Sequence, residues 1–268
     1  MKRLFILLLL CLPQLAQASG QALEQQPASA AVRLVSAVPV LHALGLSLLK
    51  DTGIEAVYLP PRRLPVNRIP GWLSKADAGK LPSAAALLTI ESVWSDLGLY
   101  PLLRKADIRV VPVDVARELA PGGAQVTLRP ALDTPGYFWL DFNNLLLMTN
   151  VAARDLSRLW PNQAERIEGN RRSLQRHIQQ YAIDIDELLL NADIGTLATD
   201  DERLMPLAMG LALPLVHADE ADLLLSADKG QRQGRVWQLN PLARPAQGDL
   251  VAWLNAQSKG LKQALARR

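Results

Sequence analysis

Residues 137–195 read YFWLDFNNLLLMTNVAARDLSRLWPNQAERIEGNRRSLQRHIQQYAIDIDELLLNADIG. From Pro161 onward, apolar side chains recur at alternating spacings of three and four residues, the pattern of a helix with one buried stripe. Pro161 suits a first helical position, and Gly195 lies just past the expected end. We therefore predict a linking helix over residues 161–194. The residues of the stripe are Ala164, Ile167, Leu174, Ile178, Tyr181, Ile185 and Leu188, with Arg171 in the one remaining place.

The length of this predicted helix bears on how the chain is divided. A helix of about 30 residues spans roughly 45 Å, which is enough to join two lobes as a rigid strut. Upstream of it we expect an aromatic strand at residues 137–141 and then a first helical segment. One long surface helix on a single domain is the alternative, and the periodicity alone does not separate the two interpretations.

The N-terminus has the three parts of an export signal. Met1-Lys2-Arg3 is basic, residues 4–10 are apolar, and Ala16-Gln17-Ala18 forms a small-residue cleavage site. We predict a signal peptide over residues 1–18, a flexible N-terminus over 19–30, and a periplasmic location. A membrane anchor is the alternative, but an apolar run of about 10 residues is too short to span a bilayer.

Cysteine content and charge exclude several classes of site and partner. The single cysteine, Cys11, lies within the predicted signal, so we expect no thiol, disulfide or cysteine metal site in the mature chain. Lipid attachment at Cys11 stays open, although Leu10 precedes it where lipoprotein signals usually carry Gly or Ala. Loss of the two positive charges of Lys2 and Arg3 lowers the net charge from +3 to +1. The composition therefore gives no support for a nucleic-acid partner.

Strand and helix patterns alternate on both sides of the predicted linking helix. Such alternation predicts parallel α/β lobes, here over residues 31–160 and 195–268. We thus expect two lobes, each a small, mostly parallel sheet flanked by helices, joined by one long backbone helix. The first lobe is predicted to have strands at 33–37, 54–59, 85–90 and 108–113, with helices at 40–50, around 72–73 and at 97–104. The second is predicted to have strands at 196–199, 213–217, 222–225 and 235–239, with helices at 202–210 and 248–266.

Three motifs occur in an order that carries a family resemblance. Trp139-Leu140-Asp141 ends the aromatic segment, Pro161 precedes Ala164 and Asn170, and Leu239-Asn240-Pro241-Leu242 precedes the last helix. Together they resemble the zinc- and manganese-type solute-binding proteins of bacterial metal ABC importers. The resemblance covers nearly the whole mature chain. It implies a monomer that carries a divalent transition metal between two lobes and delivers it to an ABC permease in the inner membrane.

The chain departs from this family where the metal should lie. Members of the family bind the ion with three histidines and one carboxylate, a ligand set suited to zinc or manganese. Here Val66, Tyr137 and Asp200 occupy the histidine positions, and Asn240 occupies the carboxylate position. The resemblance leaves Asp200, Asn240 and Tyr137 as metal-ligand candidates. Tyr137 can serve only if its phenol loses a proton.

The loop expected to carry the first histidine is rich in arginine instead. Arg62, Arg63 and Arg68 offer donors that match carboxylate or phosphate oxygens. They predict a site for an anionic metal chelate or siderophore-like ligand, with Tyr137, Trp139 and Trp72 as stacking surfaces. The alternative is a solvated loop beside core tryptophans. Residues 200–202 can likewise be interpreted as the cap of the helix that follows them, because carboxylates are favoured at a helix N-terminus.

The remaining histidines do not restore the ligand set or provide a catalytic one. His42, His177 and His217 are scattered along the chain, and we expect each to have a structural role. No nucleophile elbow, phosphate-binding glycine loop or zinc-protease motif is present in the sequence, so we do not expect an enzyme.

The sequence therefore predicts a periplasmic solute-binding protein of a metal-type ABC importer. It would take part in zinc, manganese or iron uptake with a degenerate metal site. Two alternatives stay open: a binder of an anionic chelate, and an accessory protein that binds no ligand.

Overall fold

The N-terminal lobe is built on a four-stranded parallel sheet with the strand order β2-β1-β3-β4. The strands are β1 (Arg33–Ser36), β2 (Glu55–Tyr58), β3 (Ala86–Thr89) and β4 (Val111–Asp114). The central strand β3 is buried at all four positions, as expected for a parallel strand that is covered on both faces. The computed structural model describes residues 32–128, 136–228, 230 and 234–266. The predicted signal peptide, Cys11 and the predicted flexible N-terminus lie outside this description.

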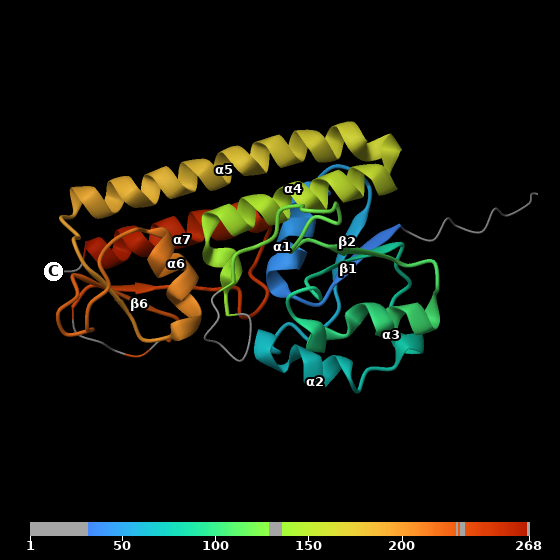
Figure 1. The fold of residues 1–268 in the computed structure, drawn as a ribbon, viewed down its shortest axis with the longest axis horizontal. Helices are drawn as coiled ribbons and strands as arrows, with labels where there is room; N and C mark the ends of the chain where they lie inside the picture. Colours follow the sequence, from blue (N-terminus) through green and yellow to red (C-terminus); the bar gives the residue numbers. More distant parts are fainter. Residues whose placement is uncertain (1–31, 129–135, 229, 231–233, 267–268) are drawn as a thin grey trace, which may run out of the picture. The chain divides into compact units, whose positions relative to one another are not determined.

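Helices cover both faces of this sheet. Figure 1 shows α2 (Ile69–Leu73) and α3 (Leu99–Ala106) on the side of the sheet opposite to α4 (Phe142–Leu159) and the long helix α5 (Ala164–Asn191). The α-helices of this lobe are α1 (Pro39–Leu48), α2 (Ile69–Leu73), α3 (Leu99–Ala106) and α4 (Phe142–Leu159). The 3-10 helices are η1 (Val66–Arg68), η2 (Ala78–Lys80), η3 (Ser95–Leu97) and η4 (Phe138–Leu140). The four strands and the helices predicted for this lobe are present, with ends shifted by a few residues.

The C-terminal lobe contains a smaller parallel sheet with the strand order β5-β6-β7. Its core includes Trp237, which is fully buried, and α7 packs against β7. The predicted fold class is therefore confirmed: two small parallel sheets are flanked by helices and joined by a long one. The elements of this lobe are β5 (Leu197–Thr199), η6 (Glu202–Leu204), α6 (Met205–Gly210), β6 (Leu223–Ser226), β7 (Val236–Gln238) and α7 (Leu250–Leu265).

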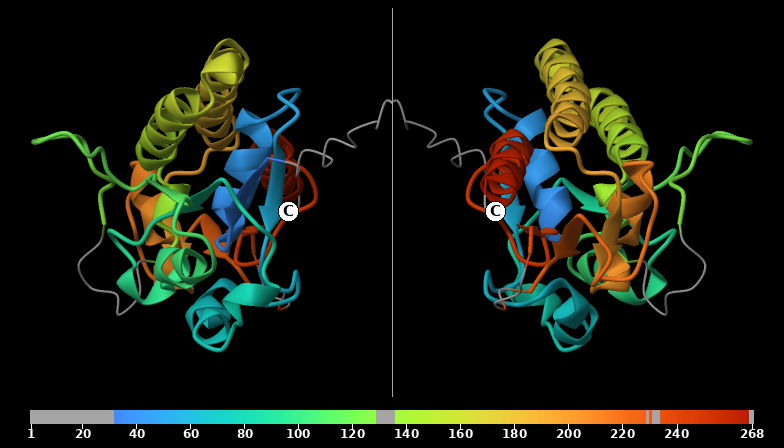
Figure 2. Two further views of the ribbon diagram at one scale, coloured as in Figure 1. Left: turned by 90° about the vertical axis from the view of Figure 1, so that its right-hand side faces the viewer. Right: turned by 90° about the vertical axis from the view of Figure 1, so that its left-hand side faces the viewer.

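The long helix α5 (Ala164–Asn191, 28 residues) follows the 3-10 turn η5 (Pro161–Gln163). It packs against α4 and α1 of the first lobe and against α7 of the second, and Figure 2 shows α4 and α5 side by side. Its buried residues are Ile167, Leu174, Ile178, Tyr181, Ile185 and Leu189. The predicted stripe is thus present from Ile167 to Ile185, whereas Ala164 is only half-buried and Leu189 is buried in place of Leu188. Residues 31–268 form one compact unit, so the lobe boundaries at 160 and 194 stay a prediction.

Arg171 occupies the gap in the apolar stripe and makes polar contacts there. Its guanidinium group pairs with Glu168 and donates a hydrogen bond to Asn150 Oδ1 of α4 at 3.1 Å. The charged group is therefore satisfied within the α4–α5 interface.

Among the described helices, none is both long and apolar enough to cross a membrane.

Two predicted strands are wrong. The strand predicted at 137–141 is replaced by the 3-10 turn η4 at residues 138–140. The Asp141 carboxylate caps α4, since it accepts hydrogen bonds from the backbone N–H groups of Asn143 (2.8 Å) and Asn144 (3.3 Å). The chain therefore turns into a helix where a strand was expected. In segment 213–217, only Leu215 makes a β-bridge, to Leu197. Pro214, next to it, has no N–H group with which to extend a ladder.

The stability of the α5 interface is testable with two isoleucines on the same helix. Ile178 is fully buried, whereas Ile183 is 50% exposed. We expect Ile178→Ala to lower the free energy of unfolding by about 2–5 kcal/mol, through lost burial and an added cavity. Ile183→Ala should lower it by at most about 1 kcal/mol. Urea titration followed by circular dichroism measures both, and equal losses would contradict this packing.

Candidate functional site

Charged side chains follow the strands of the C-terminal sheet at the edge where those strands end. Arg203 follows β5, Asp228 follows β6, and Arg244 follows β7. In open sheets with parallel strands, ligands bind in the crevice outside the carboxyl ends of the strands. The topology thus brings together three residues that are far apart in the sequence.

The N-terminal lobe reaches this edge through the loop after β2. Three hydrogen bonds join residues 62–66 to residues 243–246, and we call these two segments the interlobe clasp. The backbone N–H of Val66 donates to Ala243 O at 2.7 Å. Arg62 Nη2 donates to Ala246 O at 3.1 Å, and Arg244 Nε donates to Arg63 O at 2.9 Å. The clasp holds the arginine-rich loop against the strand ends of the other lobe.

A cavity of about 340 Å³ lies between the loop and the strand ends. Its volume is near the lower end of the range of about 300–1,000 Å³ that is usual for small-molecule sites. The side chains with the strongest chemistry in its lining are Arg68, Tyr137, Arg203, Asp228 and Arg244.

Arg203 is fixed in this lining by Asp201 and Tyr137. The Asp201 carboxylate accepts from the Arg203 backbone N–H at 3.0 Å, which caps η6, and from Arg203 Nε (2.8 Å) and Nη2 (2.7 Å). The guanidinium group lies over the Tyr137 ring, 5.0 Å from its centroid. Tyr137 N also donates to Arg203 O at 3.1 Å. The orientation of Arg203 is thus set by protein contacts alone.

The environment of the two partners shifts their pKa values in opposite directions. Burial raises the pKa of the Tyr137 phenol, and the nearby Arg203 opposes this only in part. For Asp201, burial alone would raise the pKa, but hydrogen bonds from Arg203 outweigh it and hold the pKa below its usual range. Tyr137 therefore stays a neutral O–H donor, and a phenolate metal ligand is disfavoured.

Positive charge predominates around the cavity. Within the described ranges, neither Arg68 nor Arg244 forms an ion pair with a carboxylate. Arg203 is paired with Asp201, and Asp228 adds one further negative charge at the lining. Two guanidinium groups are therefore available to an anionic ligand, for which their fork of donors is well shaped.

The structure brings some of the predicted site residues together and separates others. Of the predicted site residues, Arg68 and Tyr137 line the cavity; Val66, which stands at the position of a family histidine and cannot bind a metal, lines it as well. Arg62 and Arg63 belong to the clasp and do not contribute side chains to the lining.

The two oxygen-donor candidates have structural partners. Asp200 accepts a hydrogen bond from Ser226 Oγ at 2.8 Å, outside the cavity lining. Asn240 Oδ1 accepts from Leu242 N at 3.1 Å and so supports the left-handed conformation of Leu242, with φ of 55°. In the part of the chain that the structure describes, no three His, Cys, Asp or Glu side chains gather to hold a metal ion.

Arg203, Asp228 and Arg244 were missed by the sequence analysis. The only signal for them was their place within about five residues of the ends of predicted strands. Of the predicted stacking residues, Trp139 is 1% exposed and donates from Nε1 to Pro241 O at 2.9 Å, which makes it a core residue. Trp72 is partly buried against the same core.

The three histidines lie outside this cavity. His177 is exposed on α5, and His217 is exposed in the loop before β6. His42 lies on α1 with its ring centroid 5.5 Å from that of Tyr58. Burial, with a contribution from Arg62, lowers the pKa of His42 to about 4, so its imidazole is neutral in the folded protein.

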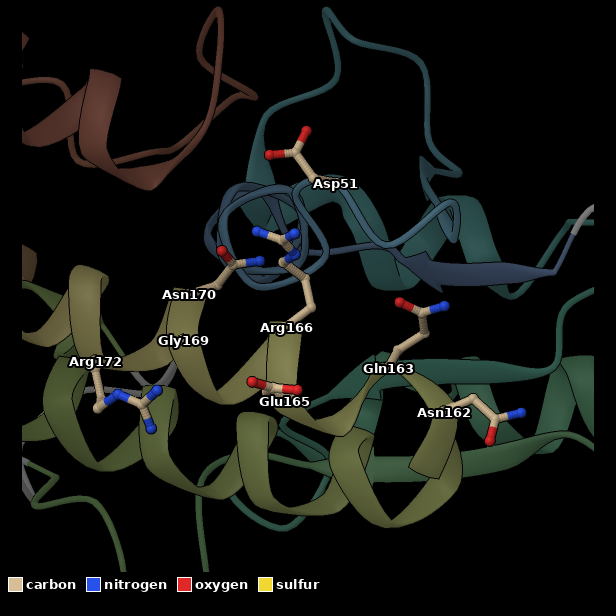
Figure 3. A pocket seen from close by; sticks show the side chains of 8 residues that line it. All are labelled: Asp51, Asn162, Gln163, Glu165, Arg166, Gly169, Asn170 and Arg172. Carbon is tan, nitrogen blue, oxygen red and sulfur yellow. The ribbon is translucent and has the colours of Figure 1, made fainter.

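A second hollow, of about 670 Å³, lies where the start of α5 meets the turn after α1. Figure 3 shows Gln163, Arg166 and Asn170 on the side of the helix that faces the Asp51 turn. Asn170 has a structural role, because its Nδ2 donates hydrogen bonds to Leu48 O (2.9 Å) and Lys50 O (2.8 Å) at the end of α1. Asp51 and Arg166 are exposed; Asp51 lies in the turn before β2 begins and Arg166 in the first turn of α5, so neither follows the carboxyl end of a strand. We therefore place the candidate site in the smaller cavity.

Comparison with solved structures identifies proteins of the same fold. A zinc-bound mutant variant of AdcAII from Streptococcus pneumoniae matches 88% of this chain and 98% of its own, with a TM-score of 0.65 and 13% identity. FpvC from Pseudomonas aeruginosa in complex with Mn²⁺ matches 88% and 97%, with a TM-score of 0.63 and 14% identity. A crystal structure of ZnuA matches 87% and 98%, with a TM-score of 0.60 and 13% identity.

These likenesses confirm the predicted resemblance at the level of the fold. No family model matches the sequence, and no curated protein matches it. Sequence identities this low show only that the fold is shared. The identity of the ligand has to be inferred from the residues of the site.

The neutral state of His42 gives a pH dependence that is testable. The pKa is lower in the folded protein than the ordinary value of 6.5, so the unfolded chain binds more protons between about pH 6.5 and pH 4, and stability falls as the pH falls through this window. We expect His42→Phe to remove this loss, which we take as on the order of 2 kcal/mol after allowing for partial exposure.

The measurement is urea unfolding of wild type and variant at pH 7 and pH 4.5. His177→Phe is the matched control on an exposed face and should follow the wild-type pH profile. A constant stability difference between wild type and His42→Phe at both pH values would contradict a buried neutral imidazole.

Proposed function

We propose that this protein is an extracytoplasmic solute-binding protein of a metal-type ABC importer, and that its cavity takes an anionic metal chelate in place of a bare ion. The observation that carries the proposal is the set of three guanidinium groups, those of Arg68, Arg203 and Arg244, around one cavity between the lobes. The shared fold with proteins solved in zinc- and manganese-bound forms supports the transport role.

Electrostatics favour the chelate over the bare ion. At a separation of about 5 Å and an effective dielectric constant of about 20, one guanidinium group repels a divalent cation by roughly 7 kcal/mol. Within the described residues, the cavity lining offers one carboxylate, Asp228, and no histidine. A metal whose charge is covered by a carboxylate chelator meets attraction from the same arginines.

The remaining parts of the proposal follow from the sequence. The export signal over residues 1–18, cleaved after Ala18, would place the mature chain in the periplasm. Its partner would be an inner-membrane ABC permease that receives the loaded protein, and the protein would act as a monomer without catalysis. We keep lobe limits of 31–160 and 195–268, with 161–194 as the linking helix.

The proposal predicts which arginines matter for binding. With zinc citrate as the probe, we expect Arg68→Gln and Arg244→Gln each to weaken binding to the mature protein by at least tenfold, because each removes from the lining a guanidinium group that forms no ion pair with a described carboxylate. Arg244→Gln also removes the clasp hydrogen bond to Arg63 O, so Arg68→Gln is the variant that tests the lining alone. Arg63→Gln, which leaves the lining intact, should change affinity by less than twofold. Isothermal titration calorimetry measures each dissociation constant.

The competing functions give different results in the same titrations. If zinc chloride alone binds at micromolar affinity, about −8 kcal/mol, and Arg68→Gln does not change this affinity, the result would support transport of the bare ion instead. Absence of heat with zinc chloride, citrate and zinc citrate alike would contradict anion binding and favour the accessory role.

A further inference from the structure

Asp228 is a carboxylate at the lining of a cavity that is otherwise rich in arginine. It comes two residues after β6, and its backbone is held by three hydrogen bonds. Asp228 N donates to Ser226 Oγ at 3.2 Å, while its carbonyl oxygen accepts from Ser226 Oγ at 3.4 Å and from Gln238 Nε2 at 3.1 Å. The position of Asp228 therefore does not depend on its carboxylate.

The Asp228 carboxylate differs from that of Asp201 in its partners. Asp201 is engaged on both oxygens by Arg203. For Asp228, no ion pair or side-chain hydrogen bond joins its carboxylate to any other residue of the described ranges. Its charge nevertheless acts on Tyr137 and Arg203, since it is the smallest of several causes that raise the pKa of each. Asp228 thus faces the same space as the guanidinium groups, with its oxygens available to a ligand.

This arrangement fits a ligand with negative charge at its edge and positive charge at its centre. Arg68 and Arg244 can bind the outer carboxylate oxygens of a chelator. Asp228 can take one coordination position on the metal, in place of a water, because carboxylate oxygen is a ligand of zinc, manganese and iron. A metal-free chelator has the opposite effect at this point, since its carboxylates lie against Asp228 without a cation between them.

We propose that Asp228 makes the cavity selective for the metal-loaded form of a compact polycarboxylate chelate over its metal-free form. This inference rests on the proposed function. The cavity volume of about 340 Å³ restricts the chelate to a small one, near the lower end of the range for ligand sites. Selection at the binding step would keep empty chelator from occupying the carrier.

The test compares free citrate with zinc citrate, as the metal-free and metal-loaded forms of one compact tricarboxylate. Calorimetry on the mature wild-type protein, freed of metal by a chelating resin, should give at least tenfold tighter binding of zinc citrate. In Asp228→Asn, the same side-chain shape without charge, we expect free citrate to bind at least threefold more tightly than in wild type. The ratio between the two probes should then fall below threefold.

Asp219→Asn removes one charge from an exposed position outside the cavity and should keep the wild-type ratio. A ratio that is unchanged in Asp228→Asn, or a wild-type protein that binds both probes equally, would overturn the role of Asp228 and leave anion binding intact. Failure of wild type and Asp228→Asn to bind either probe would overturn this inference together with the proposed function.

Discussion

The burial of one face of α5 is the interaction on which the arrangement of the two lobes depends. The helix contacts α1 and α4 from one lobe and α7 from the other, so one apolar stripe belongs to both cores. Among the residues that the structure describes, no strand pairing joins the two sheets. The helical layer therefore decides where the carboxyl ends of β5, β6 and β7 lie relative to the loop after β2. The cavity is a consequence of that placement.

The chemistry of the cavity is set by how its charges are paired. Asp201 neutralises Arg203 and holds it over Tyr137, which makes this arginine a fixed part of the wall. Arg68 and Arg244 form no ion pair with a carboxylate of the described residues, although Arg244 Nε donates to Arg63 O in the clasp. Leu242 adds a local cost, because a buried leucine in the left-handed region is strained. Its turn, supported by Asn240, delivers Ala243 and Arg244 to the clasp.

The sequence predicts the parts of the fold that have a regular period. The stripe of α5 and the strands of both sheets follow from apolar spacing, since burial of a continuous face demands it. Segment 137–141 was misassigned because its consecutive aromatic residues are compatible with a strand, whereas the capping carboxylate of Asp141 favours a turn into α4. Segment 213–217 was misassigned because apolar composition alone does not reveal the missing donor of Pro214.

The candidate site was predictable only in part, for a physical reason. Tyr137 was found because motif order placed it at a family position, and Arg68 because arginines cluster in its loop. Asp228 and Arg244 lie in irregular segments, and Arg203 lies in the short 3-10 helix η6, so no periodic pattern marks them. Only the parallel topology and the clasp bring them to one cavity.

Under the proposed function, the clasp also bears on how an ABC permease would recognise this protein. Its three hydrogen bonds join protein groups only, so none of them needs a ligand. At a net value of about 1 kcal/mol each, they favour the joined lobes over separated ones by roughly 100-fold. Ligand-free and ligand-bound molecules would then have nearly the same surface shape. A permease that receives only loaded molecules would have to sense the charge at the cavity mouth, where a bound anion offsets the field of the arginines.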